Sequence, residues 1–125
     1  MKNYKDRLTV KAVKFFLDGA LGSRGAAMLE NYTDAPMQRG QLRLDEHTFR
    51  TNASAWAKAG WQLATHAIGD RANRLVLDVY EKACHDAMVE TSEAPDLRLR
   101  VEHFQVCAFH GWFGPLPTPV SVYHQ

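Results

Sequence analysis

The chain has 125 residues, of which 46% are apolar and 23% are charged, with 15 lysines and arginines against 14 aspartates and glutamates. This is the composition of an ordinary globular protein, and a net charge of +1 without a basic cluster offers no electrostatic surface for nucleic acid. No apolar run reaches the roughly 18 to 20 residues that a membrane-spanning helix needs.

The first predicted element is a strand from Leu8 to Leu17, which is rich in β-branched and aromatic residues and ends at Asp18-Gly19. An irregular stretch follows as far as about Leu44 and contains Pro36 and several glycines. A loop of this length inside a compact domain is usually either functional or disordered.

Two helices are predicted after this loop. Asp45 is placed to cap the first one near Glu46, apolar residues then recur at spacings of three and four, and Gly60 is placed to end it. The second helix opens at Asp70 and carries the longest apolar stripe in the chain, from Ala72 to Ala87.

Two further strands alternate with these helices, one from Trp61 to Ala67 and one from Leu97 to Glu102. Strands that alternate with helices predict right-handed crossovers and a parallel sheet, so the fold class is α/β. Two helices cannot cover both faces of a three-stranded sheet, and we therefore expect a part of something larger. No structure is predicted from Phe104 to Gln125.

Candidate chemistry gathers at the carboxyl ends of the three strands, where parallel α/β folds build their sites. These ends carry Lys14 with Asp18, His66, and His103. Strict alternation places His103 on the face opposite Glu102, so a bulge is needed if the two are to share a polar site. Considered one at a time, each of these histidines and the lysine has a simpler interpretation as a hydrogen-bonded or surface residue without a functional role. The chain contains no His-x-His, His-Glu-x-x-His or paired C-x-x-C motif.

The glycines after the first strand invite a second interpretation as a phosphate-binding loop. Their spacing is G-x-x-G-x-x-G, and Ser23-Arg24-Gly25 stands where a Walker loop needs Gly-Lys-Ser/Thr. A mobile active-site loop is favoured instead, with Arg24 as a contact for a substrate anion or carbonyl group. Asp18 is a second substrate-binding candidate because it shares a strand face with Lys14, although it could also simply terminate the strand.

Three segments together resemble a known family. Their sequences are VKFFLDGALGSR (Val13–Arg24), WQLATHAIGDRA (Trp61–Ala72) and LRVEHFQ (Leu99–Gln105). In this order they are similar to motifs of the metal-dependent amidohydrolases, most closely amidohydrolase family 3, the branch of the N-substituted formamide deformylase-like enzymes. The resemblance covers residues 8–105, a fragment of the catalytic barrel, and leaves 106–125 as a divergent Pro-rich tail.

The resemblance implies a (β/α)₈ barrel in which the three strands are approximately strands four to six. A complete barrel needs about 250 residues, so the chain would supply a partial one. The family pattern implies that Lys14, carbamylated, bridges two divalent metals and that His66 and His103 are ligands of the second. Neutral imidazoles suit zinc, which is therefore the expected cofactor, with one or two ions in the full-length protein.

Two parts of the family's site have no counterpart in the sequence: a His-x-His on strand one and a catalytic Asp on strand eight. No catalytic set is complete in this chain. We expect a hydrolase fragment whose parent enzyme hydrolyses non-peptide C–N bonds of small amides or formamides, with the isolated chain inactive. The alternative is a non-catalytic α/β fragment that associates with itself through open sheet edges. Two cysteines without C-x-x-C spacing favour a reducing cytoplasm.

Overall fold

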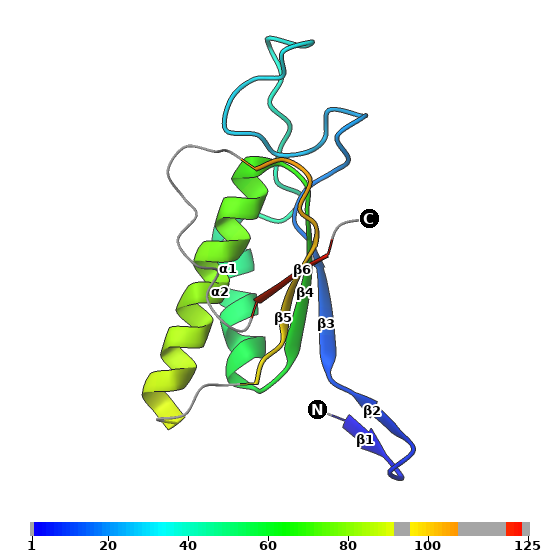
Figure 1. Ribbon diagram of the computed structural model, residues 1–125, viewed down its shortest axis with the longest axis vertical. Coiled ribbons are helices and arrows are strands. Elements are labelled where there is room, and N and C mark those ends of the chain that lie inside the picture. The colour runs from blue at the N-terminus through cyan, green and yellow to red at the C-terminus, as the bar shows by residue number, and fades with distance from the viewer. Residues whose placement is uncertain (1, 92–95, 108–119, 124–125) are drawn as a thin grey trace.

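The computed structural model describes residues 2–91, 96–107 and 120–123 (Figure 1). Its elements are β1 (Lys2–Tyr4), β2 (Leu8–Val10), β3 (Ala12–Phe16), α1 (Glu46–Lys58), β4 (Gln62–Ala67), α2 (Asp70–Thr91), β5 (Leu99–His103) and β6 (Val120–Tyr123). The strands β3, β4, β5 and β6 lie side by side in that order in one parallel sheet, while β1 and β2 form a separate antiparallel hairpin. The α/β class, the parallel strands and the crossover helices are thus confirmed, in an open sheet.

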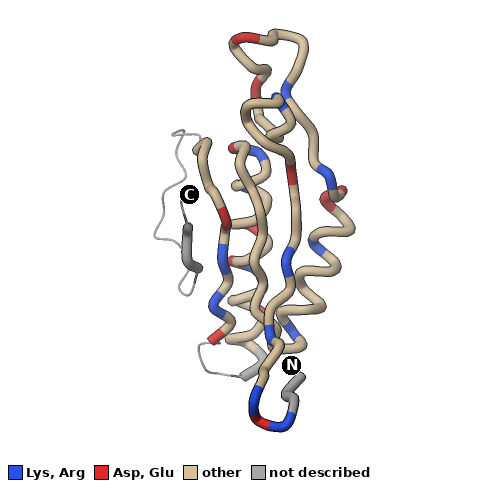
Figure 2. Tube along the Cα trace, turned by 90° about the vertical axis from the view of Figure 1, so that its right-hand side faces the viewer, with Lys and Arg blue, Asp and Glu red and all other residues tan. Residues whose placement is uncertain are grey.

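The first strand differs from its prediction as one continuous element. It divides at Lys11, so that β2 pairs with β1 while β3 pairs with β4. Leu8 and Val10 are 58% and 46% exposed, so no core contact draws this part of the segment into the main sheet. Figure 2 shows the hairpin at one end of the sheet and the long loop at the other.

The third strand begins at Leu99 rather than Leu97, because Arg98 has a left-handed backbone with φ of +46° and cannot continue a ladder. A fourth strand, β6, lies in the tail for which no structure was predicted, and it pairs with β5. The rest of that tail, residues 108–119 and 124–125, and residues 92–95 of the polar stretch lie outside the described residues.

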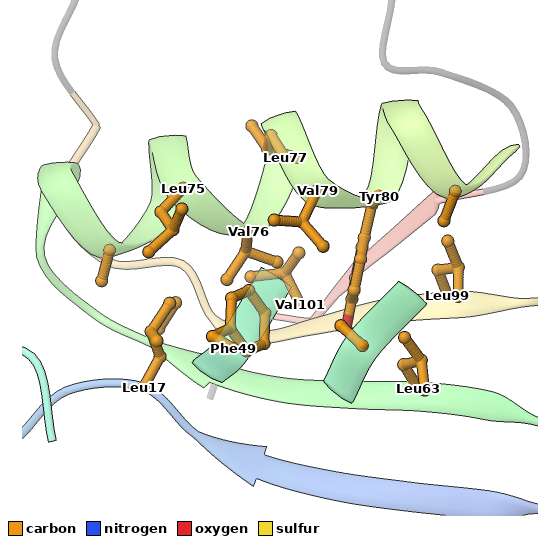
Figure 3. Packing of buried hydrophobic residues seen from close by; sticks show 14 of the residues in the cluster. Leu17, Phe49, Leu63, Leu75, Val76, Leu77, Val79, Tyr80, Leu99 and Val101 are labelled. Atoms are coloured by element: carbon orange, nitrogen blue, oxygen red, sulfur yellow. The ribbon is translucent and has the colours of Figure 1, made fainter. Parts of the chain in front are cut away.

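Both helices cover the same face of the sheet (Figure 1). The Asp45 side chain caps α1 by accepting from the Thr48 amide at 2.9 Å, as its position predicted. Alternation along the strands sends one set of side chains toward the helices, where they form the core shown in Figure 3. This core includes Leu17, Phe49, Ala53, Leu63, Ala67, Leu75, Val76, Val79, Tyr80, Leu99 and Val101.

The opposite face of the sheet has no helix against it among the described residues (Figure 1). It presents the other set of alternating side chains, namely Ala12, Lys14, Phe16, Gln62, Ala64, His66, Arg100 and Glu102. Phe16 is 60% exposed there. No helix of the described chain is long and apolar enough to cross a membrane.

Tyr80 links α2 to two strands, and this gives a prediction about alkaline pH. Its hydroxyl lies 2.7 Å from Thr65 Oγ1 and donates to the Arg100 carbonyl at 3.2 Å, and burial raises the pKa of Tyr80 well above its ordinary value. The folded chain therefore holds this proton more tightly than the unfolded chain, whose tyrosines titrate near pH 10. The stability that Tyr80 contributes is fully present below about pH 10 and is lost as the pH rises beyond it.

We expect the free energy of unfolding of the wild-type chain to fall more steeply above about pH 10 than that of Tyr80→Phe. At neutral pH the variant should be less stable by about 1–3 kcal/mol, because the Arg100 carbonyl loses a buried donor. Urea titrations between pH 8 and 11 measure both effects. Parallel curves for the two proteins would contradict the prediction.

Candidate metal centre

The long loop, residues 18–44, folds over the carboxyl ends of the strands (Figure 1), and Asp18 fixes it there. The Asp18 side chain is buried and accepts hydrogen bonds from three backbone amides, those of Ala27 at 2.9 Å, Ile68 at 3.0 Å and Gly69 at 2.8 Å. One carboxylate thus joins the loop to the segment that follows β4. Asp70 adds a second link, since its Oδ1 accepts from the Leu29 amide at 2.8 Å.

His66 and His103 lie in contact at this edge of the sheet. Their ring centroids are 4.6 Å apart, with the planes at 67° in an edge-to-face arrangement. His66 stands one residue before the end of β4, and His103 is the last residue of β5. The structure thus brings these two side chains together, while their role as metal ligands stays a prediction.

His103 reaches this position through backbone torsion and not through the bulge that alternation suggested. His103 and Phe104 both have left-handed φ, +78° and +48°. The turn takes the His103 ring to His66 and leaves Phe104 buried in the core at 8% exposure. Left-handed conformations cost non-glycine residues of order 1–3 kcal/mol and gather at functional sites.

The environment of His66 fits a ligand imidazole. Its Nε2 atom is buried, lies 3.5 Å from Asp18 Oδ1 and has no hydrogen-bond partner in the described part of the chain. Burial lowers the pKa of His66, and His103 and Lys14 act in the same direction against the opposing charge of Asp18. Metal binding requires the neutral imidazole that these influences favour.

Lys14 lies farther along the open face. Its Nζ atom is 3.6 Å from Glu102 Oε2 and 5.3 Å from the centre of the Phe16 ring, and the side chain is 36% exposed. Arg100 pairs with the other oxygen of Glu102 at 2.6 Å. In this structure the Lys14 side chain thus pairs with Glu102, and its carbamylated form stays a prediction.

The remaining sequence candidate, Arg24, is exposed at the tip of the loop. It pairs with Asp34 at 3.0 Å, which raises the pKa of Arg24 and lowers that of Asp34. The amides of Gly19, Arg24 and Gly25 donate to carbonyl groups within the loop, so these amides are not available to cradle a phosphate. A substrate contact by Arg24 or by the buried Asp18 stays a prediction.

Two residues near the histidines were not singled out from the sequence. Glu102 pairs with Lys14. Its place two residues after Arg100 in the strand is the signal that predicts both side chains on the same polar face. Asn73 lies buried in α2, and no local pattern distinguishes it from other helical polar residues. Within the described residues, no group of three or more His, Cys, Asp or Glu side chains is arranged to hold a metal ion.

Solved structures share the fold of this chain. A metal-dependent hydrolase from Pyrococcus horikoshii OT3 is 32% identical, with a TM-score of 0.66 over 82% of this chain and 19% of that one. A metal-dependent hydrolase from Pyrococcus furiosus is also 32% identical, with a TM-score of 0.61 over 78% of this chain and 18% of that one. The fold of this chain is therefore shared with proteins of the metal-dependent hydrolase class.

The family is more specific than the class. The profile of the amidohydrolase family matches residues 1–111, and the chain belongs to this family, which confirms the resemblance of its three motifs. The protein LONG AFTER FAR-RED 3 of Arabidopsis thaliana is 39% identical over 98 residues, which are 78% of this chain and 16% of that protein. The putative amidohydrolase YtcJ of Bacillus subtilis is 41% identical over 71 residues, 57% of this chain and 13% of that protein. The match thus spans 16% and 13% of the length of these two relatives.

Proposed function

We propose that this chain supplies two ligands and a lysine to the metal centre of an amidohydrolase that cleaves non-peptide C–N bonds in small amides or formamides. The observation that carries the proposal is the contact between His66 and His103, with the buried Nε2 of His66 left without a hydrogen bond. The match covers only 16% and 19% of the length of these two relatives, so the proposed barrel is completed by segments outside this chain.

In the proposed site His66 and His103 hold a divalent cation, and zinc is the cation that two neutral imidazoles suit. Lys14, once carbamylated, offers oxygen atoms toward the same edge of the sheet. The bound metal would lower the pKa of a water molecule and polarise the carbonyl of the substrate. Asp18 holds the loop beside His66, and the Phe16 ring packs against the His66 ring with the centroids 5.7 Å apart. The proposed location is the cytoplasm.

Zinc binding tests the two ligands directly. We expect His66→Ala or His103→Ala to weaken zinc binding by about tenfold or more, because each removes one of two adjacent imidazoles. His85→Ala is the matched control, since His85 lies on α2 and is 76% exposed. Isothermal titration with zinc alone measures the effect. Equal affinity in all four proteins would sink the assignment of the two ligands.

The isolated chain should be inactive even with zinc present. It lacks the residues that the family places on strands one and eight, so it has no complete ligand set and no general base. Assays for formate or amine release from an N-substituted formamide measure this. Robust, zinc-dependent turnover that His66→Ala abolishes would overturn the expectation of inactivity while supporting the site.

A second candidate is a non-catalytic role in self-association, which the open sheet favours. One edge of the sheet is β3, which pairs on one side only among the described strands, and the face beside it exposes Phe16. Unpaired strand edges pair readily with other chains. Size-exclusion chromatography discriminates the two: oligomers that bind no zinc favour association, and a stable monomer that binds zinc through His66 favours the metal centre.

A further inference from the structure

A single buried amide side chain joins the two segments that carry the histidines. Asn73, in the first turns of α2, is 3% exposed. Its Nδ2 group donates to the Ile68 carbonyl at 3.1 Å and to the Val106 carbonyl at 2.9 Å. Ile68 is the first residue after β4, and Val106 lies three residues after the end of β5. Both N–H groups of this one side chain therefore donate to the strand exits, the segments that directly follow the two adjacent strands β4 and β5.

The pairing of β4 with β5 ends at Ala67 and His103, so other hydrogen bonds hold the two strand exits together. Beyond β5 the chain turns through the left-handed residues His103 and Phe104. It then returns to the segment after β4, where the Phe104 amide donates to Ala67 at 3.0 Å and the Val106 amide donates to Ile68 at 2.9 Å. Asn73 adds two side-chain hydrogen bonds to these backbone bonds from the helix side.

The donors of Asn73 are used, whereas its acceptor is not. Its buried Oδ1 atom has no hydrogen-bond partner in the described part of the chain. The position thus requires two N–H groups facing two carbonyl oxygens. An aspartate has nearly the same shape but offers only acceptors, which would face those carbonyls with like partial charge.

We propose that Asn73 is a positioning residue that sets the separation of His66 and His103, and so the affinity of the pair for a divalent cation. The proposal rests on the function proposed above. Asn73 acts through the backbone at Ile68 and Val106, and outer-shell residues that orient metal ligands typically change metal affinity by about 10–100-fold when replaced.

The test compares Asn73→Asp with Val76→Ala in the full chain. Val76 lies one turn farther along α2 and is fully buried, and its apolar side chain makes no hydrogen bond, so its replacement destabilises the same helix and removes no hydrogen bond from Ile68 or Val106. Two quantities are measured: the nuclear Overhauser contact between the two imidazole rings without metal, and the affinity for zinc. We expect Asn73→Asp to lose the ring contact and about tenfold in zinc affinity, and Val76→Ala to keep both.

A folded Asn73→Asp chain with the ring contact and zinc affinity of the wild type would overturn the proposal. If Asn73→Asp does not fold, the wild-type chain still decides: both Nδ2 protons should exchange slowly and show coupling to the Ile68 and Val106 carbonyl carbons. Rapid exchange without coupling would overturn it. If the wild-type chain binds no zinc, the proposed function fails, yet the ring contact still tests the positioning role of Asn73.

Discussion

Replacing Asp18 by alanine is expected to remove a large part of the free energy of unfolding of the chain. Three buried amides, those of Ala27, Ile68 and Gly69, would lose their only acceptor among the described residues. Each unsatisfied buried donor costs about 1–3 kcal/mol, so the three together cost roughly 3–9 kcal/mol. This is a large share of the 5–15 kcal/mol by which ordinary domains are stable. Urea denaturation followed by far-ultraviolet circular dichroism measures the loss.

Two further variants separate hydrogen bonding from other effects of Asp18. Asp18→Asn keeps the shape but replaces one oxygen by a donor, so it should recover only part of the lost stability. Asp34→Ala removes an exposed carboxylate from the same loop, where its pair with Arg24 is screened by solvent, and should leave the denaturation midpoint nearly unchanged. If Asp18→Ala were as stable as Asp34→Ala, the carboxylate would not be the link between loop and sheet.

The role of Asp18 shows where sequence reasoning stops. The strand before it, the helix cap at Asp45 and the apolar stripe of α2 follow from residues within a few positions of each other, and the structure contains these elements. The partners of Asp18 are 9, 50 and 51 residues away along the chain. No local pattern specifies which distant amides a carboxylate meets, so the sequence could only suggest a strand end or a substrate contact.

The two histidines show the same difference between what local sequence predicts and what distant contacts decide. Alternation from Gln62 places His66 on the open face of β4, and the structure agrees. The same rule places His103 on the helix face, which is wrong because His103 and Phe104 are two consecutive left-handed residues. Nothing in the sequence around Glu102 and Phe104 indicates this conformation. That turn depends on tertiary hydrogen bonds to Ala67 and Ile68. The resemblance to the family motifs implied that both histidines belong to one site, and the left-handed turn explains how their rings come into contact.

Gly69→Ala is expected to be the second most damaging of these substitutions. A Cβ atom at Gly69 would collide with the backbone of Ala27, meeting its carbonyl group and lying 2.8 Å from its nitrogen. Neither side can yield easily, because the Asp18 carboxylate binds the amides of both residues. Overpacking of this kind costs about 1–3 kcal/mol or more, which corresponds to a fall in melting temperature of roughly 5–15 °C in a domain of this size.

Gly22→Ala is the matched control for this prediction. Gly22 belongs to the long loop that carries Ala27, but a Cβ atom added there would meet nothing within 4 Å. Scanning calorimetry should therefore show a melting temperature close to that of the wild type for Gly22→Ala and a marked decrease for Gly69→Ala. Zinc affinity should fall as well in Gly69→Ala, because Gly69 lies three residues beyond His66 and its displacement moves the end of β4. A Gly69→Ala chain with wild-type stability would mean that the loop does not rest on the sheet at this point.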